Sequence, residues 1–128
     1  MTESGLGPET IHFDKGFKME VLDFSAHYLL RPEAVESFFI LHKLTGDPVY
    51  REWGWEVFNN IERFCKAETA YGGRNDVNEI SEDPTDKMES FFLSETLKYL
   101  YLLFDPESEI DILHKVCVWR KVKLMLLC

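Results

Sequence analysis

The sequence predicts an all-α protein built from antiparallel helical hairpins, and three observations lead to this prediction. Two stretches, at about 32–44 and 49–66, carry apolar residues at helical spacing, and only the Gly46-Asp47 link separates them. A third apolar stretch ends at about Phe104. These helices are apolar on so many sides that three of them cannot cover one another. We therefore expect part of a larger all-α array, incomplete on its own.

The composition indicates a single folded domain that does not bind nucleic acid. The chain has 128 residues, of which 45% are hydrophobic and 14% aromatic, so it can bury a core. Its net charge of −9 disfavours contact with phosphate backbones. Cys65, Cys117 and Cys128 lack the spacing of a zinc site or a disulfide framework. We expect no membrane span and no signal peptide in this chain, because no apolar run is long enough.

The first helix is expected from about Pro32 to Leu44, after an irregular segment. Glycine and proline punctuate residues 1–27, which predicts loops with short extended pieces at about 11–13 and 17–24. Gly46 is a natural helix stop. Asp47-Pro48 is a typical cap and first helical position. So short a link predicts that the second helix packs antiparallel to the first.

A third helix is expected after a loop over residues 67–86. Tyr71-Gly72-Gly73 predicts a tight turn within that loop. The helix could begin at Asp83-Pro84 or at Asp86, and from Met88 onward it is apolar on every face. We therefore expect it to be buried nearly all round. Glu89 and Glu95 are unusual there, because a buried carboxylate is costly unless it is paired or hydrogen-bonded.

The start of the first helix gathers charged residues that could be either structural or functional. Pro32 suits the first helical position, and Glu33 then lies in the first turn, where the helix end favours negative charge. Glu36 follows three residues later on the same face. The plain interpretation is a capped, solvated helix start in which Arg31 forms a surface ion pair with Glu33. Spacing alone does not exclude it.

Carboxylates on two helices also allow a catalytic interpretation. Glycoside hydrolysis needs one carboxylic acid to protonate the leaving oxygen and one carboxylate to activate water. Carboxylates also suit Ca²⁺, which takes several oxygen ligands. Phe91 could stack on the apolar face of a sugar, although core packing is its default role. The candidate constellation comprises Arg31, Glu33, Glu36, Glu89, Phe91 and Glu95.

Long blocks of the sequence resemble the class I α-1,2-mannosidases, which form glycoside hydrolase family 47 and include endoplasmic-reticulum and Golgi enzymes. The resemblance covers about residues 5–113. Gly5-Leu6-Gly7-Pro8-Glu9 and Phe13-Asp14 resemble the segment that precedes the last catalytic motif. The blocks that carry the resemblance most specifically are 30–37 (LRPEAVES), 44–50 (LTGDPVY) with 53–56 (WGWE), and 86–104 (DKMESFFLSETLKYLYLLF).

The resemblance implies a fold and an activity. The family fold is an (α/α)₇ barrel, and its members are inverting, calcium-dependent hydrolases that trim α-1,2-linked mannose from high-mannose N-glycans. By this resemblance Glu33 matches the catalytic general base, and Arg31, Phe91 and Glu89 match substrate-binding positions. Two further carboxylates match positions that bind calcium through its waters, Glu36 and Glu95.

The sequence also departs from the family pattern. Family members carry their general acid and another catalytic acid upstream, in helices that have no counterpart here. They also place an Asn-Thr-Glu-Ala-His-Pro segment, whose threonine binds calcium, soon after the position of His114, and residues 115–123 do not match it. We therefore expect residues 1–115 to be a C-terminal portion of a catalytic domain and 116–128 a non-family tail. Alone, such a fragment should be inactive.

Two functions are compatible with these blocks. One is a mannosyl-oligosaccharide 1,2-α-mannosidase of N-glycan processing, acting in the endoplasmic reticulum or Golgi, whose members are commonly membrane-associated. The other is a degradation-enhancing, mannosidase-like protein that binds misfolded glycoproteins. Trp53-Gly54-Trp55 and the Gly-Pro-Glu segment favour the processing enzymes.

Overall fold

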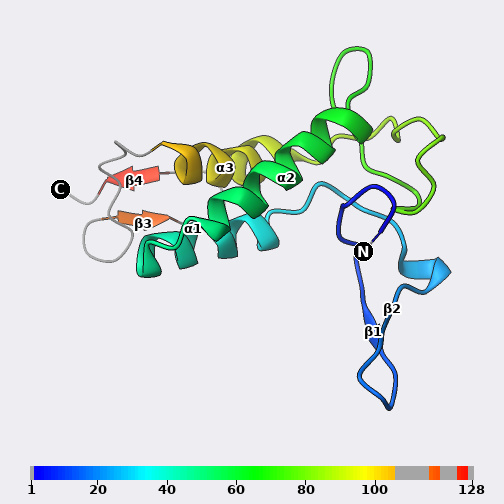
Figure 1. The fold of residues 1–128 in the computed structure, drawn as a ribbon. Coiled ribbons are helices and arrows are strands. Elements are labelled where there is room, and N and C mark those ends of the chain that lie inside the picture. The colour runs from blue at the N-terminus through cyan, green and yellow to red at the C-terminus, as the bar shows by residue number, and fades with distance from the viewer. Residues whose placement is uncertain (1, 106–115, 119–123, 127–128) are drawn as a thin grey trace.

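The computed structural model describes residues 2–105 and the backbone of 116–118 and 124–126, and within these residues three α-helices pack against one another (Figure 1). The all-α prediction is confirmed for the bulk of the described chain, since its strands are only two or three residues long. The helical elements are the 3₁₀ turn η1 (Asp23–Ser25), α1 (Glu33–Thr45), α2 (Val49–Phe64), the π-helical turn η2 (Phe92–Thr96) and α3 (Leu97–Phe104).

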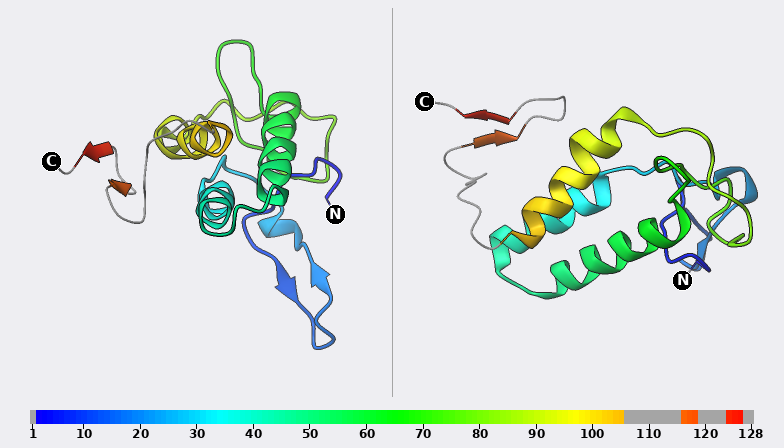
Figure 2. Two further views of the ribbon diagram at one scale, coloured as in Figure 1. Left: turned by 60° about the vertical axis from the view of Figure 1, so that its left-hand side comes forward. Right: turned by 90° about the horizontal axis from the view of Figure 1, so that it is seen from above.

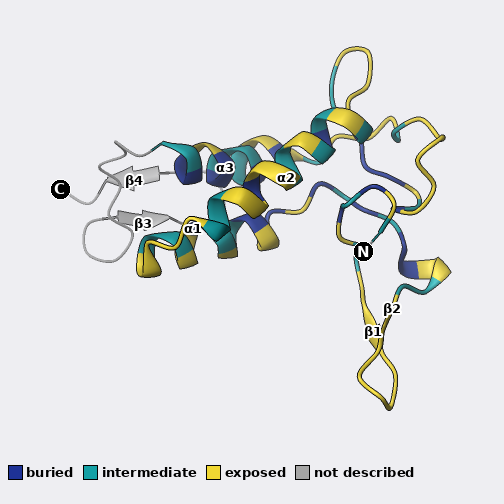
Figure 3. Cartoon of the chain, in the orientation of Figure 1, coloured by how far each residue is buried: buried dark blue, intermediate teal, exposed yellow. Residues whose placement is uncertain are grey.

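The strands form two small antiparallel pairs. Strand β1 (His12–Phe13) pairs with β2 (Met19–Glu20), and β3 (Val116–Val118) pairs with β4 (Leu124–Leu126). The β1–β2 hairpin projects away from the helices and is exposed along its length (Figures 1 and 3). Residues 2–27 are thus irregular apart from this hairpin and η1, as predicted.

The α1–α2 hairpin follows directly from its two-residue link. Gly46 adopts φ 72° at the end of α1, and its N–H donates to the His42 carbonyl at 2.8 Å. The Asp47 carboxylate then accepts a hydrogen bond from the Val49 N–H at 2.9 Å. The chain reverses within these residues, and α2 packs against both α1 and α3 (Figure 2). The predicted hairpin is confirmed.

Replacing Asp47 should destabilise the hairpin measurably. In Asp47→Ala the first turn of α2 loses its side-chain acceptor, and we expect a loss of about 1 kcal/mol in the free energy of unfolding. Urea denaturation followed by circular dichroism measures this change. Asp47→Asn keeps the acceptor oxygen and should stay within about 0.5 kcal/mol of the wild type. Equal stability of the alanine and asparagine variants would contradict the capping role.

The third helix begins at Ser90, so the predicted starts at Asp83-Pro84 and Asp86 are wrong. The segment before it is held extended, because the Thr85 N–H donates to the Gly73 carbonyl at 2.9 Å. The Gly72 backbone also lies against the Thr85 carbonyl, so closely that a side chain on Gly72 would overlap it. Tertiary contacts therefore override the local cap signals here.

The prediction of a tight turn at Tyr71-Gly72-Gly73 is also wrong. The turn lies earlier, where the Ala67 N–H donates to the Ala70 carbonyl at 2.9 Å. Gly72 instead lies in a paired segment, since its N–H donates to the Cys65 carbonyl at 2.8 Å. The two glycines permit close backbone approach.

Arg74 organises the loop that follows α2. Its side chain is buried, and its guanidinium donates to the carbonyls of Phe64 at 3.1 Å, Glu82 at 2.6 Å and Glu79. Its backbone pairs in both directions with Tyr28, at 2.8 and 2.9 Å. Arg74 therefore ties the end of α2 and the loop together through its side chain, and the segment leading to residue 30 through its backbone.

The apolar core lies between the helices, but the third helix is not buried all round as predicted. Tyr99, Leu100, Leu102 and Leu103 are buried, whereas the outer face of the helix lies open to solvent (Figure 3). Glu89 and Glu95 are half-buried instead of buried. The cause is the one inferred from the sequence, since three helices cannot cover one another completely. Among the described residues, no helix is long and apolar enough to cross a membrane.

Candidate active site

A strained residue sets up the start of α1. Leu30 is fully buried yet has φ 60°, a left-handed conformation that is unfavourable for a leucine. Its carbonyl accepts a hydrogen bond of 2.6 Å from the Thr96 hydroxyl, which comes from the π-helical turn η2. Strained residues and π-helical turns both concentrate at functional sites. This contact joins the two elements that carry the candidate residues.

Arg31 is the centre of the site. Its Nε donates to the Glu9 carboxylate at 2.6 Å, and its guanidinium lies 5.7 Å from the centre of the Phe91 ring. The hydrogen bond that Arg31 donates to Glu9 is the main cause that raises the pKa of Arg31. The negative charges of Glu9, Glu33 and Glu89 raise it further. The structure therefore brings three of the predicted residues, Glu33, Glu89 and Phe91, around the guanidinium of Arg31.

The principal partner of Arg31 is Glu9, not Glu33. Glu9 reaches the site from the segment before the β1–β2 hairpin, and its N–H is held by the His27 carbonyl at 2.9 Å. Glu9, Arg31 and Glu33 also line one cavity of about 320 Å³. Glu9 was not among the predicted site residues. The only signal for it in the sequence is its place in the Gly5–Glu9 block.

Phe91 and Glu89 reach Arg31 from the segment where the third helix begins. Glu89 is half-buried and pairs with Lys87, Nζ to Oε1 at 2.5 Å. Phe91 is half-buried, and the guanidinium of Arg31 lies over one face of its ring. An aromatic ring beside a guanidinium and a carboxylate is a combination that can bind a sugar by stacking and by hydrogen bonds.

The two predicted calcium-associated carboxylates, Glu36 and Glu95, lie within α1 and η2. Glu36 accepts a hydrogen bond from the Tyr99 hydroxyl at 2.8 Å, and Glu95 lies in η2. Ca²⁺ takes six to eight oxygen ligands. Among the described residues, no three acidic, histidine or cysteine side chains converge closely enough to hold a metal ion. The part of the chain that the structure describes does not fit a calcium site by itself.

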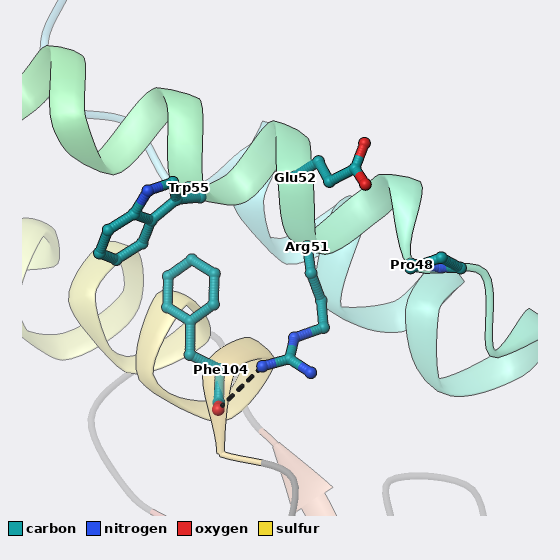
Figure 4. Close-up of a pocket in the computed structure, with 5 residues that line it drawn as sticks. All are labelled: Pro48, Arg51, Glu52, Trp55 and Phe104. Carbon is teal, nitrogen blue, oxygen red and sulfur yellow. Dashed lines mark hydrogen bonds between the residues drawn. The ribbon is translucent and has the colours of Figure 1, made fainter.

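A second hollow lies at the other end of the α1–α2 hairpin (Figure 4). It measures about 460 Å³ and lies between the start of α2 and the end of α3. Arg51 Nη2 donates to the Phe104 carbonyl at 3.4 Å, and Trp55 meets the Phe104 ring edge-on at 5.5 Å. Its size exceeds that of the cavity at Arg31, but only one carboxylate, that of Glu52, lines it. It offers no carboxylate pair for hydrolysis.

Comparison with known proteins gives the same family that the sequence blocks indicated. The family model described as "Glycosyl hydrolase family 47" matches residues 1–118. The chain belongs to glycosyl hydrolase family 47. The match ends within residues 116–128, whose assignment as a non-family tail stays a prediction, as does the boundary at residue 115.

Curated relatives of this family-47 chain are mannosidases. It is 45% identical over 108 residues to human mannosyl-oligosaccharide 1,2-alpha-mannosidase IC, which covers 84% of this chain and 17% of the relative. It is 47% identical over 111 residues to mannosyl-oligosaccharide 1,2-alpha-mannosidase MNS1 of Arabidopsis thaliana. This match covers 87% of this chain and 19% of the relative. The chain thus spans less than a fifth of the length of these relatives.

A solved structure supports the fold as well as the family. The alpha-1,2-mannosidase from Trichoderma reesei superposes with a TM-score of 0.62 and is 41% identical, covering 66% of this chain and 18% of that one. This structural match to an α-1,2-mannosidase confirms the predicted (α/α)₇ barrel architecture. The helices of the described chain are one part of such a barrel.

Proposed function

We propose that this chain supplies the general-base side of an α-1,2-mannosidase active site. The observation that carries this proposal is the convergence of Glu9, Glu33, Glu89 and Phe91 on Arg31. The proposed substrate is an α-1,2-linked mannose at the end of a high-mannose N-glycan. The names of the relatives support a mannosyl-oligosaccharide as the substrate class.

Glu33 is the proposed general base. It lies at the first position of α1. In the inverting reaction its carboxylate takes a proton from a water molecule as the water oxygen bonds to the anomeric carbon. The bond to the leaving oxygen breaks at the same time, and that oxygen takes a proton from a separate carboxylic acid. The described residues contribute the base, and by family resemblance the acid comes from upstream helices.

Arg31 is the proposed sugar-binding cation. Its guanidinium is held by the ion pair with Glu9 and lies over the ring of Phe91. A fixed fork of N–H donors can bind adjacent sugar hydroxyls without losing much side-chain freedom on binding. Glu89, which is close enough to raise the pKa of Arg31, is the proposed second hydrogen-bonding group for the sugar.

A chimera tests this proposal. The 108-residue segment of human mannosidase IC that matches this chain would be replaced by the corresponding residues of this chain. We expect the chimera to release mannose from a high-mannose glycan with kcat within about tenfold of the parent enzyme, because the proposed base and sugar-binding groups are all present. A folded chimera that binds the glycan but releases no mannose would contradict the proposal, and would favour the glycoprotein-binding alternative.

The 128-residue chain alone should not hydrolyse the glycan at an enzyme-like rate. A base without its acid partner loses about 10²–10⁴-fold of the rate. The measurement is mannose release by the purified chain with Ca²⁺ present. Turnover above about 1 s⁻¹, typical of an intact enzyme, would show that the described residues form a complete site.

Calcium is the cofactor implied by the family, and we propose that most of its ligands lie outside the described residues. Isothermal calorimetry of the purified chain should detect weak or no Ca²⁺ binding, with Kd above about 1 mM, because a carboxylate pair offers too few oxygens. Glu36→Gln serves as the comparison, and its Ca²⁺ binding should equal that of the unmodified chain. Micromolar binding that is lost in Glu36→Gln would contradict this expectation.

The proposed site of action is the endoplasmic reticulum or the Golgi apparatus, where high-mannose N-glycans are trimmed. Expression of a tagged chain and comparison with markers of both compartments would test this location.

A further inference from the structure

Thr96 has no part in the proposed function, but its hydrogen bond is unusual. It is fully buried at the end of η2, and its hydroxyl donates to the Leu30 carbonyl at 2.6 Å, across 66 residues of the chain. A threonine in a helix can bond the carbonyl four residues earlier. Here that carbonyl, of Phe92, accepts the N–H of Leu97 in the five-residue pattern of a π turn. The hydroxyl of Thr96 instead bonds a partner outside its own helix.

The carbonyl that Thr96 bonds controls the direction of the backbone at Arg31. The Leu30 carbonyl and the Arg31 N–H belong to one planar peptide unit, so fixing the carbonyl fixes the plane from which Arg31 extends. Leu30 is fully buried with φ 60°, a conformation that a leucine keeps only where surrounding contacts hold it. The hydrogen bond from Thr96 is such a contact. Without it, the unsatisfied buried carbonyl would favour rotation of this peptide unit.

The same hydrogen bond fixes Arg31 relative to Phe91. Phe91 directly precedes η2, and Thr96 is the last residue of that turn. The bond therefore joins the turn that follows Phe91 to the peptide unit that leads into Arg31. The guanidinium of Arg31 lies 5.7 Å from the centre of the Phe91 ring, and this spacing depends on both elements being held in place.

We propose that Thr96 is a positioning residue for sugar binding, because its hydroxyl holds the Leu30–Arg31 peptide unit and so keeps the guanidinium over the Phe91 ring. This inference rests on the proposed function of Arg31 as the sugar-binding cation. Glu9 holds the far end of the Arg31 side chain through the ion pair of 2.6 Å, and Thr96 holds its backbone end. A side chain fixed at both ends loses less freedom when a ligand binds.

Sugar binding to the mannosidase IC chimera tests this role. Thr96→Val keeps the shape of the side chain without the hydroxyl, and Thr96→Ser keeps the hydroxyl. Calorimetry in the Glu33→Gln background gives the Kd of an α-1,2-linked mannose disaccharide without turnover. We expect Thr96→Val to raise Kd about tenfold or more, because small misplacements of a binding group are costly, and Thr96→Ser to stay within about threefold.

The kinetic parameters of the active chimera separate positioning from a general loss of stability. With Glu33 intact, Thr96→Val should raise KM about tenfold and change kcat less than about threefold, as expected when a ground-state binding contact is lost. Partial unfolding alone would lower the apparent kcat and leave KM unchanged. If the Thr96→Val chimera does not fold, Thr96→Ala and Thr96→Ser form a second pair that differs only by the hydroxyl. Circular dichroism checks that each variant keeps its helices.

Thr45→Val is the matched control. Thr45 lies at the other end of α1, and its hydroxyl also donates to a backbone carbonyl, that of Leu41 at 2.8 Å. The same substitution removes the same group there, away from Arg31. We expect Kd and KM of this variant to equal those of the parent chimera.

NMR of the 128-residue chain tests the positioning without sugar or hydrolysis. The Arg31 Nε–H donates to Glu9, so its signal should exchange slowly with solvent, and Arg31→Lys assigns that signal by removing it. We expect exchange about tenfold faster or more in Thr96→Val than in Thr96→Ser or the unmodified chain, because Arg31 then leaves Glu9 more often.

Three results would each overturn the inference. They are unchanged exchange of the Arg31 Nε–H in Thr96→Val, disaccharide binding by the Thr96→Val chimera as tight as that of its parent, and equal losses in Thr96→Val and Thr96→Ser. A parent chimera that binds no disaccharide, while the Arg31 signal responds to Thr96→Val as expected, would instead contradict the proposed function and leave the positioning of Arg31 by Thr96 supported.

Discussion

Glu33→Gln should lower kcat of the mannosidase chimera about 1,000-fold, which is the usual scale for loss of a general base. Glutamine has nearly the same shape and can still accept and donate hydrogen bonds, but it cannot take a proton from water. Substrate contacts through Arg31 and Phe91 remain, so KM should change less than about threefold. Steady-state rates of mannose release over a range of glycan concentrations separate the two parameters.

Glu52→Gln provides the control for this measurement. Glu52 is also in the first turn of its helix, α2, and is exposed at the far end of the hairpin from Glu33. We expect kcat and KM of this variant to equal those of the unmodified chimera. If Glu33→Gln retains more than about a tenth of kcat, then Glu33 is not the base.

Gly72→Ala should destabilise the chain by about 3 kcal/mol, the upper end of the range for overpacking. A Cβ at this position would lie 1.7 Å from the Thr85 carbonyl oxygen, which is backbone and cannot rotate away. The loop would have to move, and the Thr85 N–H would lose its hydrogen bond to the Gly73 carbonyl. Because this loop leads to Glu89 and Phe91, the damage would extend to the candidate site.

Gly7→Ala is the matched substitution for Gly72→Ala. No atom outside its immediate neighbours lies within 4 Å of a Cβ built on Gly7, so its cost should stay within about 0.5 kcal/mol. Urea denaturation of both variants gives the two free energies of unfolding. Similar values for Gly72→Ala and Gly7→Ala would mean that the contact with Thr85 does not hold the loop.

The sequence predicted well those features that depend on neighbouring residues. The α1–α2 hairpin follows from Gly46 and Asp47, whose backbone and side-chain hydrogen bonds act within a few residues. The exposed apolar surfaces were expected because the helices are apolar on more sides than three helices can cover. Both could be derived because local geometry determines them.

Features that depend on distant contacts could not be derived in this way. Thr85 has local helix-start signals on both sides, but its pairing with Gly73 across the loop holds the chain extended. Likewise Glu9 is 22 residues from Arg31, and spacing does not indicate their ion pair. The left-handed conformation of Leu30 has no signature in its residue type, because leucine disfavours it.

The family blocks identified residues that the local patterns left ambiguous. From spacing, Arg31 and Glu33 could be a solvated ion pair, and Phe91 could be core. The structure instead places Arg31 between Glu9 and Phe91, with Glu33 and Glu89 close enough to raise its pKa. Their proposed roles in catalysis follow from the family resemblance.

A crystal structure of the Glu33→Gln chimera with a bound α-1,2-linked mannose disaccharide tests the central claim most directly. We expect one sugar ring to pack against Phe91, with its hydroxyl groups hydrogen-bonded to Arg31. The side chain at position 33 should face a water molecule near the anomeric carbon. A disaccharide bound in the barrel but out of contact with Arg31, Phe91 and position 33 would contradict the claim that this cluster forms part of the active site.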